Sequence, residues 1–265
     1  MFEGLSSLLK NDRVQLFLRL LPIAFMWAIG GVLKVASGQF KIPITNYIPH
    51  WGNRIVEAFL GKRKDILITG DEFHDEGNAM MMTNHITDAD FLYTMFSSMH
   101  MMPNRPQKII LTSDAKNLPI LGSIAKLHNF TFLNRKDPIE KQMLEIEANA
   151  KNNTDSWPLM WPEGAYLTNR RKRQADELRV KLGLPEARYT LVPRVRGMHA
   201  IARSGSVNWV YDMTFAYEGF RGALEDTADA ELIPDLNNFV HKRNKGCMHI
   251  HVARVRMPPP DVTEK

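Results

Sequence analysis

Short apolar strands alternate with helices from Gly61 onward, and this alternation constrains the fold more than any other feature of the sequence. Strand patterns separated by helical patterns indicate an α/β sheet with crossover connections. We therefore predict a mixed sheet with helices on both faces. The expected strands are Asp65–Thr69, Ala79–Thr83, Lys108–Thr112, Asn129–Leu133, Trp157–Trp161, Tyr189–Val192, Val207–Tyr217 and Met248–Val255, and the expected helices are Asp88–Met101, Leu118–Lys126, Pro138–Lys151, Asn169–Leu182 and Val195–Ala202.

The first candidate site lies where the apolar strand AMMMT ends, because α/β sheets carry their chemistry at strand ends. Asn84 and His85 follow this strand, and Asp90 comes five residues after His85. Residues five apart on one helix point about 140° apart, so the pair meets only if His85 precedes the helix and Asp90 lies in its first turn. The carboxylate then orients the imidazole as a general base. The alternative is a capping box from Thr87 to Asp90.

Three further candidate groups also follow predicted strands. Arg135 comes after Asn129–Leu133, where a guanidinium is suited to bind a phosphate; the alternative is a solvated surface cation. Glu163 and Gly164 form a turn after the strand WPLMW, where glycine lets the backbone approach a ligand; the alternative is an ordinary turn with a solvated glutamate. Pro193 ends the predicted strand that leads into the helix from Val195.

The order and spacing of these groups resemble the four blocks of the glycerolipid acyltransferase family. The blocks read NHITDAD, FTFLNR, MWPEGA and LVPRV, and the resemblance covers about residues 79–217. The stretch from WPEGAY to WVYDMTFAY is most similar to the lysocardiolipin and lysophosphatidylinositol acyltransferase branch. Two departures stand out: Ala165 and Tyr166 replace the family's threonine-containing turn, and the last block lacks the residue that usually separates valine from proline.

The resemblance implies transfer of a fatty acyl group from acyl-CoA to a free hydroxyl of a lysophospholipid. It implies that His85 and Asp90 are catalytic, and that Asn84, Arg135, Glu163, Gly164 and Pro193 bind substrate. Neither a metal nor a cofactor is expected beyond acyl-CoA as co-substrate. Two alternatives remain: a non-catalytic lipid-binding member of the same fold, and a His/Asp hydrolase of lipids or thioesters, although the sequence has no G-x-S-x-G nucleophile elbow.

The N-terminal segment favours membrane association. Residues Leu20–Leu33 carry no charge, and as a helix they cover roughly 21 Å, which is short of a ~30 Å hydrocarbon core. A thin or tilted span and a monotopic helix both fit this length. We therefore predict membrane-associated helices over residues 1–60 and an acyltransferase domain over 61–265. The expected location is the endoplasmic reticulum membrane, with a mitochondrial membrane as the alternative.

Composition excludes several other classes of protein. The single cysteine, Cys247, excludes an intramolecular disulfide framework and a four-cysteine zinc cluster. The net charge of +5 is compatible with anionic lipid, nucleotides or nucleic acid. Nucleic acid is not expected as a partner, because the chain has neither an RNA-binding aromatic signature nor zinc-finger spacing nor a long basic run.

Overall fold

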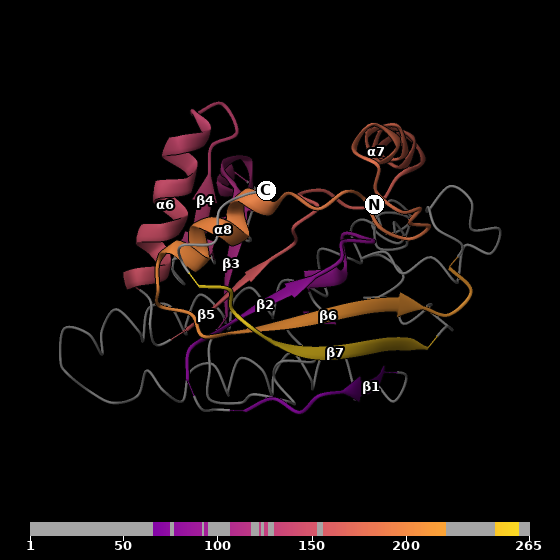
Figure 1. The fold of residues 1–265 in the computed structure, drawn as a ribbon, viewed down its shortest axis with the longest axis horizontal. Helices are drawn as coiled ribbons and strands as arrows, with labels where there is room; N and C mark the ends of the chain where they lie inside the picture. Colours follow the sequence, from indigo (N-terminus) through magenta and orange to yellow (C-terminus); the bar gives the residue numbers. More distant parts are fainter. Residues whose placement is uncertain are drawn as a thin grey trace, which may run out of the picture.

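The computed structural model describes residues 66–74, 77–91, 93–94, 107–117, 122, 125–126, 130–152, 156–220 and 247–259. Its centre is a seven-stranded sheet in the order β1-β7-β6-β2-β5-β3-β4 (Figure 1). The strands are β1 (Ile66–Gly70), β2 (Ala79–Thr83), β3 (Gln107–Thr112), β4 (Thr131–Leu133), β5 (Trp157–Met160), β6 (Trp209–Tyr217) and β7 (Met248–Arg256).

Five neighbouring strands of this sheet run in the same direction. β6, β2, β5, β3 and β4 pair in parallel, whereas β7 is antiparallel to β6 and β1 is parallel to β7. The sheet is therefore mixed, as predicted. Because parallel strands share one carboxyl-terminal edge, the segments that follow β2, β4 and β5 meet at the same edge as the end of β6.

Both faces of the sheet are packed. Along β2, Met81 belongs to one hydrophobic cluster and Met80 to a second cluster on the opposite face. Such burial on both faces is typical of a parallel strand at the centre of an α/β sheet. One cluster includes Tyr93, from the helical turn after β2, and Ala175 of α7 (Asn169–Leu182).

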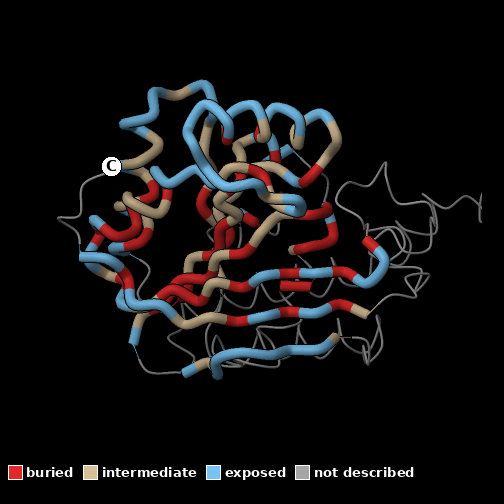
Figure 2. The backbone as a smooth tube through the Cα atoms, turned by 45° about the vertical axis from the view of Figure 1, so that its right-hand side comes forward, coloured by how far each residue is buried: buried red, intermediate tan, exposed pale blue. Residues whose placement is uncertain are grey.

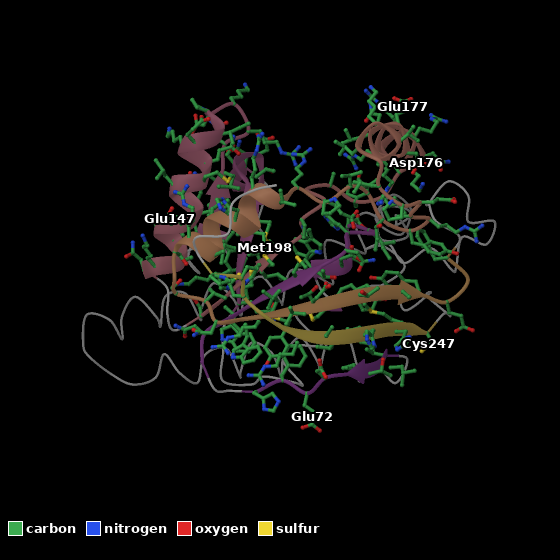
Figure 3. All side chains as sticks on the ribbon, in the orientation of Figure 1. Glu72, Glu147, Asp176, Glu177, Met198 and Cys247 are labelled. Carbon is green, nitrogen blue, oxygen red and sulfur yellow. The ribbon has the colours of Figure 1, made fainter. Side chains whose placement is uncertain are left out.

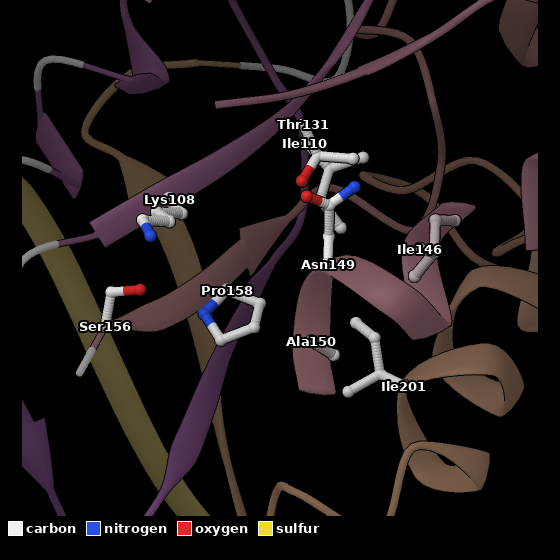
Figure 4. A pocket seen from close by; sticks show the side chains of 9 residues that line it. All are labelled: Lys108, Ile110, Thr131, Ile146, Asn149, Ala150, Ser156, Pro158 and Ile201. Atoms are coloured by element: carbon white, nitrogen blue, oxygen red, sulfur yellow. The ribbon is translucent and has the colours of Figure 1, made fainter. Parts of the chain in front are cut away.

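The opposite cluster is formed with α6 (Ile139–Asn152) and α8 (Val195–Arg203). The two helices are also joined at the surface by an ion pair between Glu147, labelled in Figure 3, and Arg203. A short 3₁₀ helix, η2 (Ser113–Asn117), follows β3. Figure 4 shows a small pocket between the sheet and the helices α6 and α8, and none of its lining residues is a candidate site residue. The lining residues are Lys108, Ile110, Thr131, Ile146, Asn149, Ala150, Ser156, Pro158 and Ile201.

Most predicted elements are confirmed. Seven of the predicted strands and the three helices from residue 138 onward differ from the observed bounds by at most two residues at either end. The predicted strand Tyr189–Val192 is wrong: these residues form no strand, because side chains hydrogen-bond to their backbone N–H and carbonyl groups. The guanidinium of Arg179 donates to the carbonyls of Thr190 and Leu191, and Glu163 accepts the Leu191 N–H.

The remaining predictions fall outside the described residues. The membrane-associated helices over residues 1–60 lie there entirely, and the predicted helices Asp88–Met101 and Leu118–Lys126 lie there in large part. Within the described ranges, the structure contains no helix with both the length and the apolar character needed to cross a bilayer.

Candidate active site

His85 and Asp90 meet in the geometry that their spacing predicts. His85 lies in the turn after β2, and Asp90 begins the following helical turn. The His85 Nδ1 lies 2.9 Å from Asp90 Oδ2. The Asp90 side chain is fully buried, whereas one fifth of the His85 side chain is exposed. The pair therefore joins a carboxylate shielded from water to an imidazole that faces the surface.

Asp90 both orients the histidine and caps the helix. Its Oδ2 also accepts the backbone N–H groups of Ile86 and Thr87 at 2.6 and 3.0 Å. Its Oδ1 accepts the Tyr217 hydroxyl at 2.7 Å, and burial raises the pKa of Tyr217 above its ordinary value, so this phenol remains a donor. The two interpretations of Asp90 drawn from the sequence are thus compatible, because one carboxylate satisfies both.

The orientation of the His85 ring leaves one nitrogen available for chemistry. A carboxylate oxygen accepts hydrogen bonds, so the proton of a neutral His85 ring belongs on Nδ1, which faces Asp90, and the lone pair on Nε2. Among the residues that the structure describes, none hydrogen-bonds Nε2. The ring stacks on Trp161, with the centroids 5.0 Å apart, and Tyr166 approaches it edge-on at 5.9 Å. These contacts restrict the orientation of the ring, and its side chain stays partly exposed.

Glu163 connects two of the four blocks from a buried position. Only 6% of the residue is exposed. Its Oε1 accepts the His85 N–H at 3.2 Å and its Oε2 accepts the Leu191 N–H at 3.0 Å. The carboxylate is therefore not solvated, and its oxygens bind the backbone on either side of the site. Its predicted role in substrate binding remains a prediction.

The pKa of Glu163 gives a testable pH dependence. Burial raises this pKa from 4.5 to about 7, against the two backbone N–H bonds, which lower it. The folded state therefore binds a proton that the unfolded state releases, so stability from this group declines as the pH rises from about 4.5 to about 7. We expect the free energy of unfolding to fall by roughly 3 kcal/mol across this window relative to Glu163→Gln.

Denaturant unfolding of the two proteins at several pH values measures this difference. The exposed Glu177 of α7 provides the control, since Glu177→Gln should leave the pH dependence unchanged. Equal pH slopes for the wild type and Glu163→Gln would show that the buried carboxyl titrates normally.

Gly164 lies close to two arginines. Its φ of +69° is a conformation that favours glycine. The Arg135 Nη2 donates to the Gly164 carbonyl at 2.8 Å, across the intervening strand β3. A side-chain carbon added at Gly164 would lie 3.6 Å from Cδ, Nε and Cζ of Arg194. Both arginines are exposed, so this turn presents two guanidinium groups at the surface.

The other predicted substrate-binding residues lie close to this site. The Asn84 side chain bonds the backbone of Phe215 twice, accepting its N–H at 2.7 Å and donating to its carbonyl at 3.0 Å. Pro193 is exposed, and the next residue, Arg194, donates its N–H to the Pro162 carbonyl at 2.8 Å. Asn84 thus ties β2 to β6, and its predicted contact with substrate remains untested, like that of Pro193.

The structure also locates the hydroxyl groups near Ala165. Thr168 is the N-cap of α7, and its Oγ1 accepts the Arg171 N–H at 3.3 Å. Tyr166 is exposed beside His85, with the Arg171 guanidinium 4.6 Å from its ring centroid. Of these two, Tyr166 is therefore the one whose hydroxyl is not used as a helix cap.

Reasoning from the sequence alone missed Tyr217, Trp161 and Arg194 as site residues. Tyr217 is the last residue of β6, and the sequence of β6 does not indicate that this strand pairs with β2. Trp161 directly follows β5 and belongs to the third block, and its closeness to Glu163 in the sequence could have indicated that it lies at the site. Arg194 follows Pro193 in the fourth block and offered a similar signal.

Comparisons with known proteins identify the family of this chain. The family model described as Acyltransferase matches residues 65–216. Lysocardiolipin acyltransferase 1 of Mus musculus is 30% identical over 62% of this chain and 44% of that protein. Lysophosphatidylinositol acyltransferase 10 of Caenorhabditis elegans is 28% identical over 62% of this chain and 43% of that protein. The chain thus matches less than half the length of these relatives.

The 1-acyl-sn-glycerophosphate acyltransferase PlsC of Thermotoga maritima aligns over 93% of this chain and 87% of its own, with a TM-score of 0.49 and 11% identity. The family model covers more than half of the 265 residues, including the segments that carry His85, Arg135, Glu163 and Arg194. This chain therefore belongs to the glycerolipid acyltransferase family.

Proposed function

We propose that this protein transfers a fatty acyl group from acyl-CoA to a free hydroxyl of a lysophospholipid. The observation that carries the proposal is the His85–Asp90 pair, whose imidazole ring contacts Trp161 and Tyr166 on either side of the turn near Arg135 and Arg194. An imidazole base next to cationic groups suits an alcohol substrate that carries a phosphate.

The proposed reaction needs only one proton carrier. The His85 Nε2 takes the proton of the lysolipid hydroxyl as its oxygen attacks the carbonyl carbon of the thioester. Asp90 stabilises the imidazolium that forms. Collapse of the tetrahedral intermediate breaks the carbon–sulfur bond, and the imidazolium returns the proton to the leaving CoA thiolate. Because the thioester is already activated, no acyl-enzyme is required, and acyl-CoA is a co-substrate, not a cofactor.

The surrounding residues have distinct proposed roles. Arg135 and Arg194 bind the acceptor phosphate, with the Gly164 turn close to both. Glu163 is a positioning residue that holds the backbone of His85 and Leu191. Asn84 keeps β2 and β6 in register at the end where His85 and Tyr217 lie.

A transfer assay tests the proposal against the two alternatives. The full chain is incubated with radiolabelled acyl-CoA and a panel of lysolipids that differ in headgroup. Labelled phospholipid is the expected product. Release of free fatty acid would identify a hydrolase instead, and lipid binding without turnover would identify a non-catalytic lipid-binding protein. The panel also identifies the preferred headgroup.

Loss of Arg135 should weaken binding of the acceptor more than binding of the donor. Arg135→Ala removes a charge-assisted hydrogen bond worth about 1.5–3 kcal/mol, so we expect the KM for the lysolipid to rise about 10–100-fold. The KM for acyl-CoA should change little. Steady-state kinetics with each substrate varied in turn provides the measurement.

Lys136 provides the control for this prediction, because it is an exposed cation on the same loop. Lys136→Ala should leave both constants close to their wild-type values. An Arg135→Ala effect confined to acyl-CoA would assign the arginine to the donor instead.

We also propose that residues 1–60 attach the domain over 61–265 to a membrane of the endoplasmic reticulum or, alternatively, of mitochondria. The support is the uncharged stretch Leu20–Leu33, together with the lipid nature of the proposed acceptor.

A further inference from the structure

The indole of Trp161 lies against one face of the His85 ring. The ring centroids are 5.0 Å apart and the ring planes are inclined by 28°, so the two rings are stacked. Trp161 directly follows β5, and His85 lies in the turn after β2, the strand that pairs with β5. Figure 2 shows the central strands as largely buried and α7, which follows the Trp161 turn, as largely exposed. The stack therefore lies where the core of the sheet reaches the surface.

Packing alone does not explain why this residue is a tryptophan. Trp161 packs against the hydrophobic cluster on one face of the sheet, and its carbonyl accepts the Gly164 N–H at 2.9 Å. Its Nε1 is buried and has no hydrogen-bond partner in the described part of the chain. A buried N–H without a partner is unfavourable, and phenylalanine at this position would avoid it. What indole offers beyond a phenyl ring is a larger and more electron-rich face.

The His85 ring becomes a cation during the proposed reaction, and this inference rests on that proposed function. The Asp90 carboxylate contacts the edge of the ring, at Nδ1, whereas Trp161 covers a face. A cation within about 6 Å of an indole centroid is attracted to the negative face of that ring, and the centroid of the His85 ring is inside this range. A neutral imidazole lacks this attraction. The stack therefore favours the charged form over the neutral one, and an interaction that strengthens as charge develops accelerates the step.

The other groups around the His85–Asp90 pair supply different interactions. Tyr166 meets the imidazole at 74°, which is an edge contact, and Glu163 accepts the His85 backbone N–H. None of these groups places an aromatic face along the imidazole, and all of them are kept in variants of Trp161. The titratable and charged groups around the pair are Asp88, Glu163, Tyr166, Arg171 and Tyr217.

We propose that Trp161 is a positioning residue whose indole face stabilises the protonated His85 ring during acyl transfer. The positive charge is then balanced from two directions, by the Asp90 carboxylate at the ring edge and by the indole at the ring face. Trp161 acts through His85 and forms no bond with either substrate. Its contribution therefore belongs to kcat and not to the KM of either substrate.

Fluorinated tryptophan tests the proposal while keeping the shape of the ring. Fluorine withdraws electron density from the indole face, which weakens the attraction for a cation, and adds little volume. The full chain is produced with tryptophan, monofluorotryptophan or difluorotryptophan. Because all five tryptophans of the chain carry the label, Trp161→Phe is the matched control, in which only the other four are fluorinated.

Proton uptake by His85 is measured from the NMR signals of carbon-13-labelled histidine, and the His85 signal is identified by its loss in His85→Ala. We expect each added fluorine to move the midpoint of this titration to lower pH, and Trp161→Leu to move it by about 0.4–1.5. In the transfer assay, kcat should fall in the same order, by about 2–30-fold for Trp161→Leu, with both KM values unchanged. Trp161→Phe should retain part of both effects of the indole.

Equal titration midpoints with and without fluorine would overturn the proposal, because only the charge on the ring face differs between these proteins. An equally large response to fluorine in Trp161→Phe would also overturn it, since the response would then come from another tryptophan. The titration does not depend on turnover. Absence of transfer by the unfluorinated protein would therefore contradict the proposed function, while the titration would still decide the role of Trp161.

Discussion

Replacement of His85 by alanine is expected to lower the rate of acyl transfer by about 10²–10⁴-fold, which is the typical contribution of a general base. The side chain supplies the only proton acceptor in the proposed step. The domain should still fold, because the His85 backbone keeps its bonds to Glu163 and Leu167. Turnover is measured with labelled acyl-CoA and the preferred lysolipid, and folding by circular dichroism.

His249 provides a matched control for this loss. It is an exposed histidine on β7 that hydrogen-bonds Thr69 at 2.7 Å. His249→Ala should therefore retain transfer activity. If His85→Ala keeps near-wild-type turnover, the proposed general base is wrong, and another group must remove the hydroxyl proton.

Asp90→Asn is expected to reduce turnover on the order of 10²–10⁴-fold in a protein that still folds. Asparagine has the size of aspartate and offers one carbonyl oxygen for the backbone N–H groups of Ile86 and Thr87. It lacks the negative charge that stabilises the protonated His85 ring. The KM values should change little, since Asp90 is buried and touches no substrate in the proposed mechanism.

Tyr217→Phe tests how much the hydrogen bond from the phenol to Asp90 contributes, because the negative charge of Asp90 is kept. It removes the hydrogen bond that the Tyr217 hydroxyl donates to Asp90 Oδ1 and leaves those of Oδ2 in place. Its effect on turnover should be smaller than that of Asp90→Asn and should leave the KM values unchanged. A loss as large as that of Asp90→Asn would indicate that the phenol, rather than the carboxylate, controls the histidine.

The His85–Asp90 contact could be predicted because it depends on local geometry. Five residues across a strand-to-helix turn allow few arrangements, and the structure has the one in which the helix begins at Asp90. The convergence of Arg135 and Glu163 on the same edge also followed from the parallel strands that precede them. In each case, the strand that immediately precedes the residue determines its position at the edge of the sheet.

Other features depend on contacts that the local sequence does not contain. The predicted strand at Tyr189–Val192 failed because side chains from outside it, Arg179 on the preceding helix and Glu163 28 residues before Leu191, bind its backbone. The position of Tyr217 follows from the parallel pairing of β6 with β2, which aligns Thr83 with Met213. No periodicity in either segment indicates that pairing.

The clamp between Asn84 and Phe215 has a consequence for how the chain reaches its native state. These residues are 131 positions apart, and β5, on the other side of β2, is also distant in sequence. Bringing such distant segments together costs loop-closure entropy before the ladder can stabilise them. We therefore expect the joining of the central strands to be the rate-limiting step of folding, so that weakening the clamp with Asn84→Ala slows refolding while a helix such as α6 still forms early.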